Sequence, residues 1–314
     1  HAHHPPAEDR LGDTLAAIRH KVMVLSGKGG VGKSSVAVNL AIALAKEDFR
    51  VGLLDIDFHG PSIPTMLGMQ NDGRPPQEGN KVVPFEIGPL KVMSIAFLLE
   101  NRDQAVIWRG AMKANVLKQL LEDVAWGELD YLIMDFPPGT GDEALSACQL
   151  VHDADGGIIV TTPQEVSLAD CRRCISFCEQ LNLPVLGVVE NMSGIVCPEC
   201  DHQFEIFKSG GGETMAQEQG VPFLGRLPLD PRLAKSCDDG KPFITHYPDS
   251  DVAKAFQNTI ENLQTQIKSR STVVVEGLPL RVAIPWDDNQ VSSHFGKCSE
   301  FVIIETDSSR KVIT

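Results

Sequence analysis

One stretch decides the fold: Gly27-Lys28-Gly29-Gly30-Val31-Gly32-Lys33-Ser34, which fits the pattern G-x-x-x-x-G-K-[ST] at every position. It follows a short apolar run at 21–25 and precedes residues 34–46, whose apolar side chains recur at helical spacing. A glycine-rich loop between a strand and a helix can wrap phosphate groups with its backbone N–H groups, and the helix N-terminus adds partial positive charge. Motif and context therefore agree on a nucleotide-phosphate site.

The loop predicts roles for individual side chains. We expect Lys33 to reach the β- and γ-phosphates and the Ser34 hydroxyl to ligate Mg²⁺. The expected nucleotide-binding set is the whole loop with one flanking serine: Gly27, Lys28, Gly29, Gly30, Val31, Gly32, Lys33, Ser34 and Ser35.

Lys28 makes this loop resemble the deviant Walker A signature of the MinD/ParA/nitrogenase iron protein class of ATPases. In that class the first lysine reaches the nucleotide of the partner subunit. The resemblance therefore implies an ATPase that works as a homodimer with two ATP molecules at its interface, and Lys28 joins Lys33 as a catalytic residue.

Two carboxylates extend the resemblance. Asp57 matches the residue that positions the attacking water in this class, a group that phosphoryl transfer needs. Asp135 ends an apolar run, as a Walker B aspartate does, and is expected to hold Mg²⁺ through water. The segment 135–142 resembles a switch II segment that responds to the γ-phosphate.

Apolar, β-branched runs alternate with helical patterns along the chain. Runs of this kind are typical of strands buried on both faces, so we predict an α/β fold with a mostly parallel, doubly wound sheet. Expected strands are 21–25, 51–54, 91–96, 131–134, 157–161 and 185–189, and expected helices are 34–46, 112–124, 142–150, 166–181 and 251–268. The polar, Gly/Pro-rich stretch 70–81 is expected to be a surface loop.

Composition excludes some classes of partner. Lys and Arg total 28 against 42 Asp and Glu, a net charge of −14, which argues against a protein that coats nucleic acid or an anionic membrane. No apolar run approaches the roughly 20 residues that span a bilayer. No signal peptide is visible, so we expect a cytoplasmic location.

Several stretches resemble the Mrp/ApbC family of nucleotide-dependent iron–sulfur carriers over residues 15–268. They are 57–64, 108–110, 129–132, 135–142 and 188–193, followed by Cys197-Pro198-Glu199-Cys200. Ala111 departs from the family, which often has proline there. The resemblance implies that Cys197 and Cys200 of two subunits hold one bridging [4Fe–4S] cluster, which is delivered to apo iron–sulfur acceptor proteins. It also implies that Asn191 ends a strand and recognises adenine, and that the loop 226–229 covers the ring.

Other interpretations remain for these residues. A C-x-x-C pair serves a Cys₄ zinc site equally well. A MinD/ParA-like positioning ATPase with structural zinc is the main functional alternative, and an electron-transferring reductase like the nitrogenase iron protein is another. The reductase places its cluster cysteines far apart in sequence, unlike this pair.

Cys171, Cys174 and Cys178 share one face of an expected helix. They can be an additional cluster site or a buried stripe of small apolar side chains. We interpret them as the buried stripe.

The last stretch of the chain resembles a second family. Residues 281–285 and 291–301 resemble the start of the dinitrogenase iron–molybdenum cofactor-binding family, which has a ribonuclease H-like α/β fold. His294 and Cys298 are its candidate metal ligands, with a structural turn as the alternative, and a molybdenum- or iron-cluster partner is implied. We expect a flexible tail at 1–14, the ATPase domain at 15–268, a linker at 269–279 and an incomplete second domain at 280–314.

Overall fold

The structure is a computed structural model that describes residues 9–99, 110–196, 203–271, 281–287, 290–291 and 300–305. The chain separates into two compact units, one ending at Ile267 and one beginning at Lys268.

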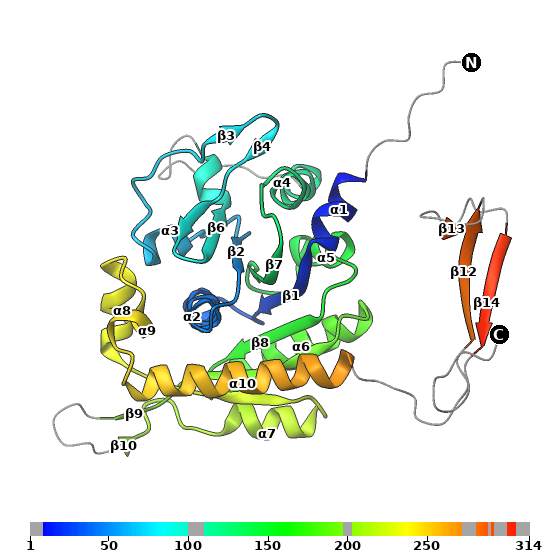
Figure 1. Cartoon of the computed structure of the whole chain (residues 1–314). Coiled ribbons are helices and arrows are strands. Elements are labelled where there is room, and N and C mark those ends of the chain that lie inside the picture. Colours follow the sequence, from blue (N-terminus) through cyan, green and yellow to red (C-terminus); the bar gives the residue numbers. More distant parts are fainter. Residues whose placement is uncertain are drawn as a thin grey trace. The chain divides into compact units, whose positions relative to one another are not determined.

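The first unit is built on one sheet with the strand order β10-β9-β8-β1-β7-β2-β6-β5, and β11 also pairs with β9 (Figure 1). Its strands are β1 (Ile18–Leu25), β2 (Val51–Asp55), β5 (Phe85–Ile87), β6 (Leu90–Ser94), β7 (Leu129–Asp135), β8 (Gly156–Thr161), β9 (Val185–Val196), β10 (Gln203–Phe204) and β11 (Phe223–Leu229). The pairs are parallel except β5 with β6 and β9 with β10. The predicted α/β fold with a mostly parallel sheet is confirmed.

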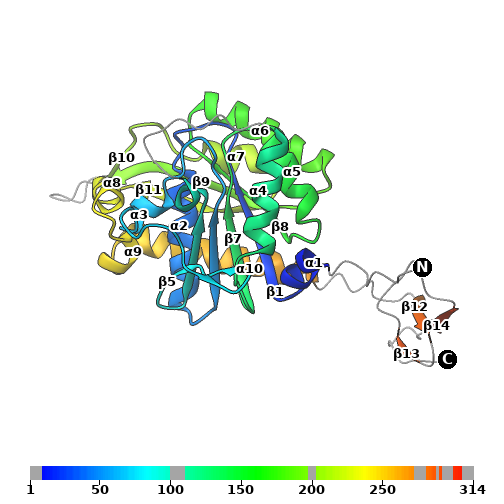
Figure 2. The same cartoon turned by 90° about the horizontal axis from the view of Figure 1, so that it is seen from above.

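Helices cover both faces of this sheet (Figure 2). They are α1 (Arg10–Ala16), α2 (Lys33–Lys46), α3 (Ile63–Met66), α4 (Gly110–Glu122), α5 (Asp142–Leu150), α6 (Glu165–Gln180), α7 (Gly211–Glu218), α8 (Pro231–Asp238), α9 (Phe243–His246) and α10 (Asp251–Ser271), with a 3₁₀ turn at Ile95–Leu98. α4, α5 and α6 lie on one face and α2 on the other, beside α10 (Figure 1). Hydrogen bonds from Gln257 and Gln264 of α10 to Glu47 join α10 to the end of α2.

The central strands do not alternate between polar and apolar residues. Residues 22–25 of β1 and 51–55 of β2 are buried without a break, because helices cover both of their faces. α2 is also buried along most of its length, from Val36 to Ala45. The glycine-rich loop therefore connects two elements that are fixed in the core.

Several elements differ from the sequence-based expectation. α1 begins at Arg10 inside the expected tail, and its Leu15 is buried. The expected loop at 226–229 is wrong, because these residues belong to strand β11; Gly225 and Pro228 interrupt the β-branched pattern that would have indicated it. Within 70–81, β3 (Gln77–Glu78) begins a short hairpin with β4 (Lys81–Val82).

The second unit contains three antiparallel strands in the order β13-β12-β14. They are β12 (Arg281–Asp287), β13 (Gln290–Val291) and β14 (Glu300–Glu305). β12 pairs with β14 from Arg281 opposite Glu305 to Trp286 opposite Glu300. The ribonuclease H-like fold stays a prediction, and His294 and Cys298 lie outside the described residues. No helix in the described ranges has the length and apolar character needed to cross a bilayer.

Candidate nucleotide site

The glycine-rich loop lies at the carboxyl edge of the sheet, between β1 and α2. Gly32 is the residue before α2 and has φ 80°, a left-handed conformation that side-chain-bearing residues rarely adopt. A Cβ atom at Gly32 would lie 2.3 Å from Asn191 Nδ2, and one at Gly27 would lie 2.4 Å from the backbone of Asp170. Glycine is therefore required at both positions by close packing, which leaves the loop backbone free to face a ligand.

Lys33 sits among the predicted carboxylates. Its side chain is buried, and Nζ donates a hydrogen bond to Asp135 Oδ1 at 2.5 Å. Nζ also lies 3.3 Å from Ser34 Oγ and 4.0 Å from Asp57 Oδ2. The structure thus brings Asp57 and Asp135, which are distant in sequence, to Lys33 and Ser34 of the loop.

Asp135 has an unused oxygen. Its side chain is fully buried, and Oδ2 has no hydrogen-bond partner among the described residues. Burial raises the pKa of Asp135, while the nearby Lys33 charge opposes that shift. An unpartnered carboxylate oxygen close to the Ser34 hydroxyl fits Mg²⁺, which takes oxygen ligands and keeps bound water.

Asp57 is oriented by its own loop. Oδ1 accepts hydrogen bonds from the backbone N–H groups of His59 and Gly60, both at 3.2 Å. These bonds fix one carboxylate oxygen and leave Oδ2 toward Lys33. The geometry suits a residue that must hold a water molecule next to a phosphate.

Asp55 is a site residue that the sequence-based prediction missed. It lies opposite Asp135 in the register of β2 with β7 and accepts hydrogen bonds from Ser94 Oγ at 3.0 Å and Asp57 N at 3.1 Å. Burial, followed by the charge of Asp135, raises the pKa of Asp55 to about 8. A polar residue at the end of an otherwise apolar strand was the available signal.

Asn191 connects a distant strand to the loop. Nδ2 donates to the carbonyl of Val31 at 2.9 Å, and the side chain is buried. Asn191 lies within β9 rather than at its end, since β9 continues to Val196, and Met192 takes a positive φ of 56°.

The other residues of the predicted nucleotide-binding set differ in exposure and in contacts. Lys28 is half-buried, and its carbonyl accepts a hydrogen bond from Ser26 Oγ at 3.0 Å. Ser35 points its Oγ to Cys237 Sγ of α8, 3.8 Å away. Gly29 and Gly30 are exposed.

The C-x-x-C pair, Cys197 and Cys200, lies outside the described residues. On either side, Val196 of β9 pairs with Gln203 of β10, and Ile195 pairs with Phe204, in antiparallel register. Phe204 and the nearby Ile206 are large apolar side chains exposed by 44% and 50%. Across the ranges that the structure describes, no group of three or more His, Cys, Asp or Glu side chains could hold a metal ion.

The three cysteines of α6 are in the core, as the buried-stripe interpretation predicts. Burial raises the pKa of Cys171 to about 12. A hydrogen bond with Cys174, together with burial, raises the pKa of Cys178. Thiols with raised pKa values are poor nucleophiles and poor metal ligands.

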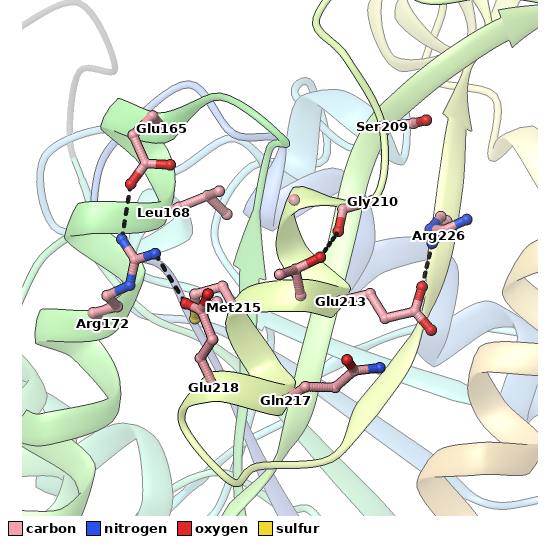
Figure 3. A pocket seen from close by; sticks show the side chains of 12 residues that line it. Glu165, Leu168, Arg172, Ser209, Gly210, Glu213, Met215, Gln217, Glu218 and Arg226 are labelled. Atoms are coloured by element: carbon pink, nitrogen blue, oxygen red, sulfur yellow. Dashed lines mark hydrogen bonds and ion pairs between the residues drawn. The ribbon is translucent and has the colours of Figure 1, made fainter.

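A groove of about 560 Å³ lies between α6, α7 and β11 (Figure 3). Arg172 pairs with Glu165 at 2.9 Å and Glu218 at 3.4 Å, and Arg226 pairs with Glu213. Both guanidinium groups of the groove are therefore already neutralised by carboxylates.

Glu190 lies beneath this region and is completely buried. Its carboxylate accepts hydrogen bonds from Ser193 Oγ and from the backbone N–H groups of Gly210, at 2.8 Å, and Gly212. Two of these donors belong to the first turn of α7 and its N-cap, where an anion is favoured. Glu190 thus ties β9 to the start of α7.

Comparison with known proteins shows what the chain is similar to. The family model described as "ParA: NUBPL iron-transfer P-loop NTPase" matches residues 17–264. A nucleotide-binding protein from Archaeoglobus fulgidus in complex with ADP is 36% identical, with 80% of this chain and 98% of that chain covered and a TM-score of 0.68. The septum site-determining protein MinD of Pyrococcus horikoshii, complexed with Mg-ADP, is 21% identical, with 82% and 100% covered and a TM-score of 0.60, which shows the fold alone.

Proposed function

Because the chain belongs to the NUBPL iron-transfer P-loop NTPase family and is an ATPase, we propose that its ATPase cycle serves an iron–sulfur cluster. The cluster is a [4Fe–4S] cargo bridging two subunits, and it is delivered to apo-proteins. The observation that carries the proposal is the pair Cys197 and Cys200, since one chain supplies half of the four thiolates that such a cluster needs. A cytoplasmic location goes with this role.

The position of β9 supports a coupling between ATP hydrolysis and the cluster. Asn191 of β9 donates a hydrogen bond to the Val31 carbonyl of the phosphate loop, and Cys197 is the next residue in sequence after Val196, the last residue of β9. A movement of the phosphate loop can therefore pass through Asn191 to β9, whose last residue directly precedes Cys197 in the sequence. In the dimer that we propose, closure on ATP changes how the two cysteine pairs face each other.

The ATPase chemistry follows from the polar cluster. Ser34 and Asp135 are the residues that would hold Mg²⁺, which would neutralise charge on the β- and γ-phosphates. Lys33 reaches the phosphates when its Nζ leaves Asp135 Oδ1. Asp57, fixed by two backbone N–H groups, holds the attacking water in line, and Lys28 reaches the nucleotide of the other subunit.

The C-terminal unit extends the proposal. The resemblance of 281–301 to a cofactor-binding family suggests that His294 and Cys298 assist exchange with a molybdenum- or iron-cluster partner. Cluster transfer measured with His294→Ala and Cys298→Ala chains tests this extension, since unchanged transfer rates would remove it.

The main experiment is anaerobic reconstitution of the whole chain with iron and sulfide, followed by an absorption spectrum and iron and sulfide assays. We expect a brown protein with about four irons per dimer. The colour should be lost in the Cys197→Ala/Cys200→Ala variant and kept in Cys237→Ala, whose thiol is half-buried against Ser35. A colourless chain that retains zinc would instead favour a structural metal in a positioning ATPase.

A further inference from the structure

Three side chains from distant parts of the sequence form a cluster beside the nucleotide site. Lys113 of α4 donates through Nζ to Glu143 Oε1 of α5. His59, in the loop after β2, has its Nε2 3.3 Å from Glu143 Oε1 and 3.2 Å from Lys113 Nζ. None of the three belongs to the phosphate loop or to the residues assigned above to ATP or Mg²⁺.

The Lys113–Glu143 pair is partly shielded from water. Their side chains are exposed by 13% and 14%, whereas most ion pairs among the described residues have at least one well-exposed partner, such as Arg50 with Glu128. Burial acts to raise the pKa of Glu143, but hydrogen bonds from Lys113, its own backbone and His59 outweigh burial and lower it. Glu143 is therefore a charged anchor, and breaking such a shielded pair costs more than breaking a solvated one.

The pair holds the loop that carries Asp57. Lys113 Nζ lies 6.0 Å from the centre of the Phe58 ring, within cation–π range, and contacts His59 directly. The backbone N–H of His59 in turn donates to Asp57 Oδ1. Two helices thus hold the two residues that directly follow Asp57.

The same pair reaches the other nucleotide-facing loop. Glu143 is the second residue of α5, and the chain that precedes α5 starts at Asp135. Through Glu143 and His59, the loop after β2 and the loop after β7 are joined by side chains as well as by strand pairing.

We propose that Lys113 and Glu143 are positioning residues of the ATPase, which hold Asp57 in its working geometry through His59. The proposal rests on the role of Asp57 proposed above. Neither residue touches ATP in this role, so their loss changes turnover and leaves nucleotide affinity nearly intact. A small displacement of a group that positions a reacting water is enough to slow the reaction.

The test is steady-state ATP hydrolysis by the whole chain for Lys113→Met, Glu143→Gln and the double variant. We expect kcat to fall about five- to fiftyfold in each single variant, with KM for ATP and Kd for ADP within about twofold of the unmodified chain. The double variant should be no slower than the slower single variant, because both substitutions break one pair. Lys113→Arg, which keeps the charge, should recover most of the lost kcat.

Two controls keep the outcomes separate. Asp123→Asn breaks a different ion pair, in which Arg10 of α1 lies 2.6 Å from the Asp123 carboxylate. This variant should leave kcat unchanged. Asp57→Asn should lower kcat strongly, and adding Lys113→Met to it should have no further effect. If Asp57→Asn has normal turnover, the proposed role of Asp57 fails. If it is slow while Lys113→Met and Glu143→Gln, with normal melting temperatures, are fast, the positioning proposal is overturned.

Discussion

At the scale of single residues, the site concentrates carboxylates around one lysine. Asp135 and Asp57 lie 2.5 Å and 4.0 Å from Lys33 Nζ, and Asp55 is fully buried directly beside Asp135 in the sheet register. Three acidic groups facing one ammonium group give an excess of negative charge in a buried place. Burial, followed by the charge of Asp135, raises the pKa of Asp55 to about 8.

Asp55 should make the stability of the nucleotide-free chain depend on pH. Because burial raises its folded pKa from 3.8 to about 8, the folded chain keeps a proton that the unfolded chain releases. The free energy of unfolding should therefore fall as pH rises from about 4 to about 8. In the Asp55→Asn variant this fall of the free energy of unfolding with pH should be absent, since the amide does not titrate.

Urea unfolding at about pH 5.5 and about pH 7.5 measures this effect in both chains. The free energy difference between Asp55→Asn and the unmodified chain should shift in favour of the variant at the higher pH. Equal differences at both pH values would mean that Asp55 is ionised throughout.

The positions of residues that belong to a local motif were predictable from the sequence. The loop pattern indicated Lys33 and Ser34, and the apolar runs that end at or before Asp57 and Asp135 indicated these two carboxylates; their roles stay predictions. Asp55 was missed because its effect depends on its strand neighbour. The cluster of His59, Lys113 and Glu143 was missed because three separate elements must fold before its members meet.

At the scale of elements, long and strongly patterned segments were predicted best. α2 and β7 appear within a few residues of their expected ends, because continuous burial leaves a continuous apolar pattern. β11 and α7 were not predicted. Their patterns are short and interrupted by glycine or proline, and β11 forms because β9 offers it a parallel partner.

The buried face of α6 should protect its thiols. With raised pKa values, Cys171 and Cys178 have almost no thiolate near neutral pH, and Cys174 is 1% exposed. Iodoacetamide at about pH 8 should therefore leave all three unmodified in the native chain and alkylate them in urea. Peptide mass spectrometry gives the extent at each site.

Alkylation of these cysteines at equal rates with and without urea would contradict the buried-stripe interpretation. Cys237 of α8 is a useful internal comparison, because burial also raises its pKa while its side chain is only half-buried. It should react faster than the α6 thiols and more slowly than unfolded cysteine.

At the scale of the whole molecule, the proposed dimer requires Lys28 for its ATP-dependent assembly. If Lys28 reaches the nucleotide of the other subunit, Lys28→Ala should lose ATP-dependent dimerisation while ADP binding by the single chain changes little. Sedimentation velocity with ADP and with a non-hydrolysable ATP analogue measures the first effect, and calorimetry the second. ATPase activity should fall by more than about tenfold, since a group that stabilises transferring charge is removed.

A Lys28→Ala chain that dimerises normally with the ATP analogue would remove Lys28 from the interface. Lys46→Ala is a matched control: it removes a lysine of α2 that is bound to the Ile244 carbonyl at 3.0 Å, away from the phosphate loop. Its dimerisation should be that of the unmodified chain.

The buried carboxylate of Glu190 holds both ends of one segment of the chain. Ser193, just past Glu190, and Gly210, on the far side of the segment that includes Cys197 and Cys200, are bound to the same side chain. The stretch between them includes the end of β9 and the two residues of β10, which pair with each other, and Glu190 binds it at both ends. How well a protein tolerates changes in a segment depends on the burial and hydrogen bonding of the backbone where that segment begins and ends. Here both ends are hydrogen-bonded to the buried carboxylate of Glu190. We therefore expect substitutions within this stretch to leave the rest of the first unit folded, because Glu190 holds both of its ends.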